Sequence, residues 1–454
     1  MNPQPAFVDV QRDVNERTGH EARWIRSPEE ANAVALLVRD LLAQELTAER
    51  AAHVALVNNR ALQAEYEEIG IAQADLAQAG LLSNPTLDVT VGFPDHPEAP
   101  VVVGGGLVQD FLDILVRPLR QKIAAAQLEQ TKLRIGDEML RLVARTKSAF
   151  YTLQGRQQLV ARLELILEIN AAAAELAKRQ HDAGNINDLD LANQEVAHNQ
   201  TKADLAFARA QVRSDREALN RLMGLWGADT GWRAADRLPE IPAREIPILR
   251  LESLAVERRL DVAAARWGVD LVGRALALKK GTRYFPVGIN VGVFTEREPE
   301  AEHVRVTGPS LALQLPVFDT GRASIARLGA EYLRSQRLLE ALAVDARSEV
   351  RDARDLMIAS RDLAEYHRAV LLPQRVLILD LTLRHYNMML KGAYDLLLAK
   401  QSEVAAERAY IEAWRDYWIA RTELERAVGG GLPALPAADR GVSQVQNTDG
   451  GPER

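Results

Sequence analysis

The sequence contains no cysteine in 454 residues. The chain can therefore form neither a disulfide nor a thiolate metal site, and it offers no cysteine for nucleophilic catalysis or for an N-terminal lipid anchor. Positive charge is also in deficit, because 63 Asp and Glu outnumber 56 Lys and Arg. Binding to phosphate backbones requires a basic surface, so we expect no nucleic-acid partner.

Long apolar runs are missing too. No run reaches 18 apolar residues, which excludes a membrane-spanning helix. Residues 1–30 lack the apolar core of a signal peptide, so either the export signal is missing from this chain or the protein is not exported. With 47% apolar and 26% charged residues, the composition is nevertheless that of a folded protein.

Catalytic and ligand-binding patterns are scarce as well. The eight histidines never form a close H-x-x-x-H pair, and no glycine-rich loop stands between a strand and a helix, as a phosphate site would need. Glycines 104–106 lie inside a strand-like run, which favours bending or close packing. His96 and His303 occupy equivalent loops, and we interpret them as solvated residues rather than metal ligands. We therefore expect no enzyme, no cofactor and no metal site.

Helix-forming residues dominate what is present. Ser27, Pro28 and Glu30 form the pattern of a capped helix start. This helix should continue to about Leu82, because Pro85 disfavours helical geometry in the residue before it. Residues 86–93 then alternate between apolar and polar, which is typical of a strand with one apolar face.

A second strand-like run covers residues 101–111, and Pro118 opens a very long helix. We expect this helix to end near Asp182 after about 64 residues, or about 95 Å. Its apolar positions alternate steps of four and three, as in a coiled coil, with Asn170 as a polar exception. The chain turns at Gly184 and returns as a helix to about Met223.

The order of elements then repeats. The predicted second set is a helix over 250–280, strands over 286–294 and 304–316, a helix from Asp319 to near Leu390 that Pro373 should kink, and a return helix from Gly392 to about Val428. Five residues beginning with Asp188 and Leu189 reappear 207 positions later, beginning with Asp395 and Leu396. The predicted domains are an N-terminal extension 1–28, a first repeat 29–224, a linker 225–249, a second repeat 250–428 and a disordered tail 429–454.

The strands impose a physical requirement. Open sheet edges leave unpaired backbone groups, which hydrocarbon does not tolerate, so four one-faced strands in a membrane must close with copies of themselves. Two chains would give eight strands and three would give twelve. Five of the eight phenylalanines lie near strand ends, as an aromatic girdle requires: Phe93, Phe111, Phe285, Phe294 and Phe318. The predicted lipid-facing residues are Leu87, Val89, Val91, Val287, Ile289 and Val291.

Three stretches, "NNRALQAEYEEIGIAQADLAQAGLLSNPTL" (58–87), "AGNINDLDLANQE" (183–195) and "MLKGAYDLLLAKQSE" (389–403), together with the duplication, resemble the TolC-like outer-membrane efflux channels. The segment "DVNERTGHEARW" (13–24) resembles the heavy-metal-efflux branch. The resemblance implies a mainly α fold with a small β part, in which duplicated helical hairpins form an α-barrel and four strands per chain complete a twelve-stranded trimeric transmembrane β-barrel.

The function implied by the resemblance is an exit duct of a tripartite efflux or type I secretion system. The implied partners are two further copies of the chain, outer-membrane lipid, a periplasmic adaptor and an inner-membrane pump, in the outer membrane of a Gram-negative bacterium. The adaptor is expected to dock at the hairpin tips, where we single out Gly184, Leu189, Gly392 and Leu396. The alternative is a soluble periplasmic coiled-coil scaffold or a pump adaptor.

Acidic residues at the hairpin tips are candidates for a periplasmic entrance or gate. We name Asp182, Asp188, Asp190 and Asp395 the tip aspartates. A threefold assembly would bring copies of each around one axis, and rings of Asp are a recurring basis of cation preference in pores. The competing interpretation is that Asp188 and Asp395 cap the returning helices, because a carboxylate near a helix start accepts from free backbone N–H groups.

Overall fold

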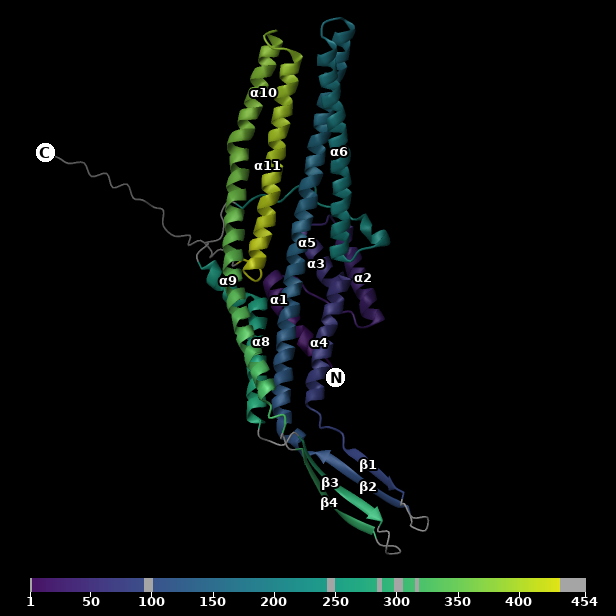
Figure 1. The fold of residues 1–454 in the computed structure, drawn as a ribbon. Coiled ribbons are helices and arrows are strands. Elements are labelled where there is room, and N and C mark those ends of the chain that lie inside the picture. The colour runs from purple at the N-terminus through teal and green to yellow at the C-terminus, as the bar shows by residue number, and fades with distance from the viewer. Residues whose placement is uncertain are drawn as a thin grey trace, which may run out of the picture.

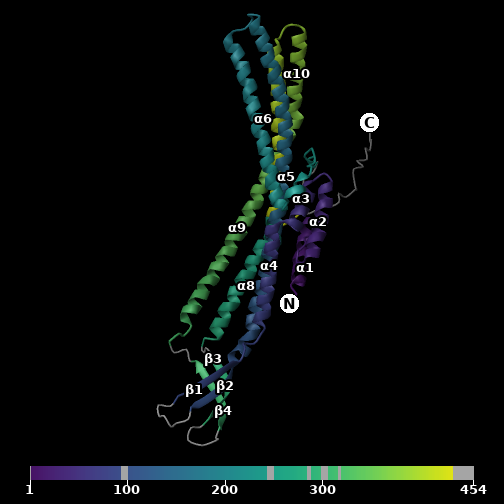
Figure 2. The same cartoon turned by 90° about the vertical axis from the view of Figure 1, so that its right-hand side faces the viewer.

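The computed structural model describes residues 2–93, 101–242, 250–283, 288–297, 305–314 and 318–432. The molecule is elongated, with two helical hairpins at one end and a four-stranded sheet at the other (Figure 1). Helices α1 to α3 pack against the side of the long helices near the middle (Figure 2). No helix in the described part of the chain is long and apolar enough to cross a membrane.

The same order of elements, a helical segment followed by two strands and a helical hairpin, occurs twice along the chain. The first set consists of α1 Gln4–Thr18, α2 Pro28–Ala43, α3 Ala48–Asn58, α4 Arg60–Ala79, β1 Thr86–Gly92, β2 Val102–Asp110, α5 Phe111–Asp182 and α6 Asp188–Met223. After the short turn η1 Gly227–Gly231, the second set consists of α7 Leu251–Arg258, α8 Leu260–Gly281, β3 Gly288–Arg297, β4 Arg305–Gln314, α9 Arg322–Tyr366, the π turn η2 His367–Leu371, α10 Leu372–Asn387 and α11 Ala393–Ala427.

The prediction of one helix from residue 29 to 82 is wrong, because the chain breaks twice and forms α2, α3 and α4. The capping box of Ser27 and Glu30 is present. The second break is at Asn59, whose backbone is extended with φ −65° and ψ 119°. Its side chain accepts a hydrogen bond from the N–H of Leu62 at 2.9 Å and donates to the carbonyl of Leu222 at 2.8 Å. These contacts stabilise a break that local sequence does not specify.

The second half has the same break at Arg259, so the predicted helix over 250–280 is also two helices. Arg259 separates α7 from α8 with φ −62° and ψ 128°, close to the values at Asn59. In each half the end of the returning helix closes onto this break. Gly224, with φ +67°, lies so close to Asn58 that a Cβ would be 2.5 Å from its carbonyl oxygen. Gly429, with φ +89°, lies against Arg258 in the same way.

The first residues of the chain, predicted only as an N-terminal extension, form helix α1. Its buried face includes Phe7, Val10 and Val14. Phe7 packs against Tyr66 of α4 with ring centroids 4.9 Å apart. Arg17, at the end of α1, donates from Nη1 to the carbonyls of Arg258 and Gly429, both at 2.7 Å. The start of the chain is therefore attached to the break of the second half.

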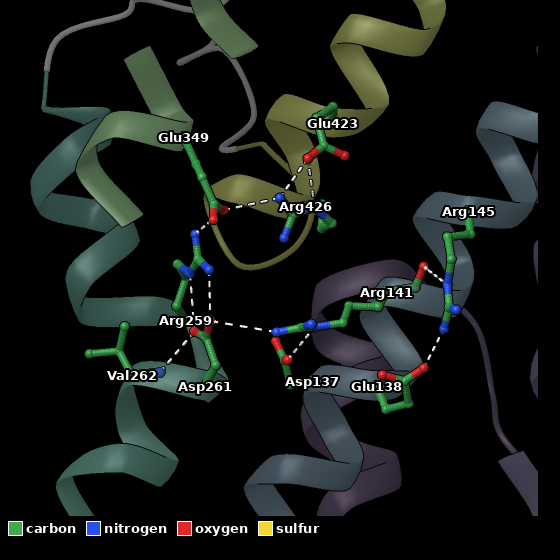
Figure 3. A network of polar contacts seen from close by, with 10 residues as sticks. All are labelled: Asp137, Glu138, Arg141, Arg145, Arg259, Asp261, Val262, Glu349, Glu423 and Arg426. Carbon is green, nitrogen blue, oxygen red and sulfur yellow. Dashed lines mark hydrogen bonds and ion pairs between the residues drawn. The ribbon is translucent and has the colours of Figure 1, made fainter. Parts of the chain in front are cut away.

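An ion-pair network links the four helices α5, α8, α9 and α11 at this level (Figure 3). Arg259 is nearly fully buried and donates to Asp261 of α8 and to Glu349 of α9, both at 2.7 Å. Arg426 of α11 binds the same Glu349 at 3.0 Å. Burial opposes ionisation of Asp261, but the bonds from Arg259 outweigh it and lower the pKa of this carboxyl. Because every buried charge here is paired, the network fixes how the helices cross.

The long helices begin and end somewhat differently from the prediction. Helix α5 starts at Phe111, not at Pro118, which lies inside the helix. Asn170, the polar exception in the coiled-coil pattern, donates to Thr201 of α6 at 2.6 Å and accepts from Gln401 of α11. Near Pro373, where a kink is predicted, the helix contains the π turn η2, which ends two residues earlier. A widened turn suits this place because proline cannot donate the regular backbone hydrogen bond.

The four strands form one antiparallel sheet in the order β1-β2-β3-β4. The pairing places Val89 opposite Gly105, Leu107 opposite Val293 and Val291 opposite Leu311. Since side chains alternate between faces and paired residues share a face, most of the large apolar residues of the four strands lie on one side, while Val102, Val108, Phe294 and Val306 lie on the other. The opposite side carries Asp88, Thr90, Asn290, Glu296 and Ser310.

The strand register corrects the predicted aromatic girdle at Phe294. Phe294 pairs with Gly106 and Gly308, so it lies on the polar face and does not belong to an outward-facing aromatic girdle. Its ring covers Gly308, where a Cβ would be 3.1 Å from Cε1. Three further assignments lie outside the described residues: Val287 and Phe285 with the strand start, His96 and His303 with the strand loops, and residues 433–454 of the tail.

Candidate functional site

The first hairpin tip is built by a glycine and an asparagine. Helix α5 ends at Asp182, and Gly184 takes the left-handed conformation with φ +74°, which lets the N–H of Asn185 donate to the carbonyl of Gln180 at 2.8 Å. Helix α6 is capped by Asn187, whose side chain accepts from the N–H of Asp190 at 2.8 Å. Gly184 therefore lies at the reversal, as predicted.

Asp188 does not cap α6, so that interpretation is wrong for this residue. Asn187 already occupies the capping position, and the carboxylate of Asp188 instead contacts Nε2 of His181 at 2.7 Å. The Asp188 side chain is 98% exposed. Asp182 is also exposed, with its carboxylate 3.9 Å from Nδ1 of the same histidine. Two carboxylates thus flank one imidazole at the end of the molecule.

The second tip has a different construction. Helix α10 ends at Asn387, and the residue in the left-handed conformation is Met389, with φ +57° and a 95% exposed side chain. Gly392, predicted to lie at the reversal, is instead the residue before α11 and has φ −87°. A left-handed methionine is an uncommon conformation. Met388 and Leu390 on either side are exposed as well.

Asp395 does serve the capping role. Its carboxylate accepts from the N–H of Gly392 at 3.0 Å and from Nζ of Lys391 at 3.3 Å. The Gly392 hydrogen bond, followed by that of Lys391, lowers the pKa of Asp395. The tip aspartates therefore differ in environment, because Asp395 is engaged by its own helix while Asp182 and Asp188 extend into solvent.

The leucines proposed for docking also differ between the tips. Leu189 is 68% exposed, whereas Leu396, its counterpart 207 residues later, is half-buried. On α11 the exposed leucine is Leu398. The two repeated segments therefore present related but unequal surfaces.

A contact between the two tips was missed by the sequence reasoning. The hydroxyl of Tyr394, in the first turn of α11, donates to Oε1 of Gln180 at the end of α5, at 2.9 Å. Burial, followed by the charge of Asp190, raises the pKa of Tyr394. An aromatic residue beside a helix start was the only signal in the sequence, and its partner is 214 residues away.

The sheet presents the second candidate surface. Its apolar face is exposed along all four strands. The most exposed large apolar strand residue on this face is Leu87, with 72% of its surface accessible. The other large exposed residues on this face are Val89, Val91, Val103, Leu107, Val291, Val293, Leu311 and Leu313. The outer edges of β1 and β4 have no strand partner among the described residues. Within the same part of the chain, no group of three or more His, Asp or Glu side chains is placed to hold a metal ion.

A family model described as outer membrane efflux protein matches residues 51–225. This segment includes β1, β2 and the whole first hairpin. The first half of the chain is therefore similar to outer membrane efflux proteins.

The chain is also similar to the cobalt-zinc-cadmium resistance protein CzcC of Cupriavidus metallidurans. It is 25% identical over 289 residues, which are 62% of this chain and 65% of that protein. The chain thus aligns with just under two thirds of the length of this relative.

Solved structures extend the likeness to the second half. A membrane protein from Pseudomonas aeruginosa has a TM-score of 0.71 at 21% identity, covering 85% of this chain and 90% of that chain. The Campylobacter jejuni CmeC outer membrane channel has a TM-score of 0.72 at 14% identity, covering 85% and 86%. These structures share the fold, mostly helical with four antiparallel strands.

Proposed function

We propose that three copies of this chain form a channel through the outer membrane of a Gram-negative bacterium. In this assembly the sheets close into a twelve-stranded barrel, and the hairpins continue it as a helical tunnel into the periplasm. The channel is the exit duct of a tripartite efflux or type I secretion system, supplied by an inner-membrane pump through a periplasmic adaptor. The match of residues 51–225 to the outer membrane efflux protein model supports this proposal.

The observation that carries the proposal is the exposed apolar face of a sheet with two open edges. Such a face in water would favour aggregation, and open edges in hydrocarbon would leave backbone groups unpaired. Closure with identical sheets removes both problems. A soluble scaffold or adaptor would have no use for an apolar face on all four strands, so we do not favour that alternative.

We place the periplasmic entrance at the hairpin tips. Helix α5 alone has 72 residues, or about 108 Å at 1.5 Å per residue, so its tip lies far from the sheet. The tip aspartates would surround the axis in a trimer. Asp182, Asp188 and Asp190 are the most available, because all three are exposed and the only ion-pair partner of their carboxylates among the described residues is His181. The neighbouring docking residues Gly184, Leu189, Gly392 and Leu396 would receive the adaptor.

For the cargo we propose divalent metal ions. The support is the name of CzcC, which concerns cobalt, zinc and cadmium resistance. The cargo is substrate here, and no resident metal site is implied.

The test is complementation in the source organism or a host that lacks its own outer-membrane efflux channels. The chain, exported together with a pump and an adaptor from its source organism, should restore growth on cobalt, zinc or cadmium salts. The purified protein should run as a trimer that dissociates on heating, and it should conduct in planar bilayers. A monomer that stays in the soluble periplasmic fraction would contradict the proposal.

A further inference from the structure

A basic belt surrounds the junction between the long helices and the sheet. Residues 111–122, 274–283 and 318–327 contain nine Lys and Arg but only two acids, in a chain whose net charge is −7. We call these nine cations the junction belt: Arg117, Arg120, Lys122, Arg274, Lys279, Lys280, Arg283, Arg322 and Arg327. They come from the start of α5, the end of α8 and the start of α9, which meet beside the sheet (Figures 1 and 2).

Internal ion pairs do not account for the belt. Three of its members have acidic partners: Arg120 binds Asp113, Arg274 binds Asp270 at 2.7 Å and Arg327 binds Glu331 at 3.6 Å. Five others have no hydrogen-bond or ion-pair partner among the residues that the structure describes: Arg117, Lys122, Lys279, Lys280 and Arg322. The remaining acid, Asp319, accepts from the backbone N–H of Gly321.

Two of the unpaired cations come from adjoining helix ends. The Cε atom of Lys279 is 3.5 Å from the position that a Cβ on Gly321 would occupy, so this side chain lies beside the start of α9. Arg322 is the first residue of that helix, where the helix dipole disfavours a positive charge. For Lys279 and Lys280 the dipole at the end of α8 is favourable, but it does not explain Arg322. Like charges gathered in this way favour an anion between them.

Exposed apolar side chains adjoin the belt on the side of the sheet. Phe111, Ile114 and Leu115 form one stripe on α5, and Lys122 continues this stripe at helical spacing. Phe318, just before α9, is 101% exposed. Apolar and aromatic side chains beside long cationic ones are the arrangement found where a protein leaves the hydrocarbon and enters the headgroup layer.

We propose that the junction belt binds the anionic phospholipid headgroups of the leaflet that faces the hairpins. This inference rests on the proposed function, since it requires the sheet to be in a bilayer. The phosphates neutralise the unpaired cations, while Phe111, Leu115 and Phe318 occupy the boundary of the hydrocarbon. The belt thereby fixes the depth of the barrel and the direction of the hairpins.

The test compares lipid selectivity of the full-length trimer in phosphatidylcholine vesicles. Electron spin resonance of spin-labelled phosphatidylglycerol and phosphatidylcholine measures how strongly each lipid is held in the first shell around the protein. A cation at an anionic surface changes local occupancy by about fivefold, so a wild-type preference for phosphatidylglycerol of about threefold, averaged over the shell, is expected. It should disappear in about 1 M salt, where the screening length is about 3 Å.

The variant K279Q/K280Q/R322Q should lose at least half of this preference. The matched control is K178Q/K202Q/R213Q, which removes the same charges from exposed positions of α5 and α6 that have no hydrogen-bond or ion-pair partner among the described residues. An equal loss in the control, or no loss in the belt variant, would overturn the inference. An unchanged preference with altered ion selectivity of the channel would mean that the cations face the lumen. Absence of any immobilised lipid around the wild type would instead contradict the proposed channel.

Discussion

Replacing Val291 by arginine tests the assignment of the apolar sheet face to lipid. Val291 lies in β3 between Gln109 of β2 and Leu311 of β4, and its side chain shares the face of Leu107 and Val293. The neighbouring Asn290 points to the opposite face, between Asp110 and Ala312. The two positions are adjacent in the chain, but their side chains lie on opposite faces of the sheet.

The size of the effect follows from the depth of Val291. Strand β3 has ten residues. At about 3.3 Å per residue and a tilt of about 40° it spans about 25 Å, which is the height of the apolar band of an outer-membrane barrel. Val291 is the fourth residue, so it lies about 4 Å from the midplane on that scale. Arginine there costs about 2–4 kcal/mol per chain, or about 6–12 kcal/mol for three copies.

The assay is the yield of heat-dissociable trimer in the outer-membrane fraction, followed by denaturant unfolding of the inserted protein. Val291→Arg should reduce the inserted trimer severely, because the cost is comparable to the stability of a typical domain, about 5–15 kcal/mol. Asn290→Arg should insert normally, since the new cation would face water beside Asp110. Equal insertion of the two variants, or a greater loss for Asn290→Arg, would refute the lipid assignment of this face.

Three further predictions concern the tips and the middle of the molecule. Bulky replacements at Leu189 and Leu396 should abolish pump-dependent export while the trimer persists. The effect should be larger at Leu189, which is more exposed. Cross-linking of the adaptor to another region would exclude this docking site. Each tip aspartate is replaced by alanine in turn, and the conductance of the channel is measured in planar bilayers. At the position that faces the axis, the replacement should weaken both the cation preference of the channel and its block by divalent ions. If all four variants keep wild-type selectivity, the gate lies elsewhere. Burial opposes ionisation of Glu49, but hydrogen bonds from His20 and Lys147 outweigh it and hold its pKa at about 2, below the ordinary 4.5. This stabilisation is therefore present above about pH 4.5 and is lost as the pH falls towards 2, so Glu49→Gln should flatten the acid dependence of the unfolding temperature over that range, and an unchanged dependence would contradict the assignment.

The two helix breaks could not be predicted from the sequence. Periodicity correctly indicated helix on both sides of Asn59 and Arg259, but neither residue is a strong breaker. Asn59 is held extended by a carbonyl 163 residues away in the chain, and Arg259 by acids on α8 and α9. Contacts between residues so far apart in the chain do not change the local hydrophobic periodicity, so the periodicity cannot reveal them.

The tips illustrate the same limit at shorter range. Gly184 could be placed at the first reversal because glycine adopts positive φ at little cost. At the second tip the glycine is present but the left-handed residue is Met389. Asp188 was a reasonable cap by residue type, yet Asn187 precedes it and occupies that position. Several residues compete for one role at each helix end, and only the path of the backbone decides among them.

The sequence by itself determined the duplicated order of elements, the one-sided strands and the long hairpins. Period-two alternation, coiled-coil spacing and chain-reversing residues are local properties, and they act wherever the chain is placed. The tertiary structure alone decided how the two halves meet, at the paired breaks around Asn58 and Arg258, and which tip residues reach solvent. It also gathered cations from three separate segments into the junction belt. Those features depend on residues brought together from distant parts of the chain, and their energies arise only once the long helices have packed.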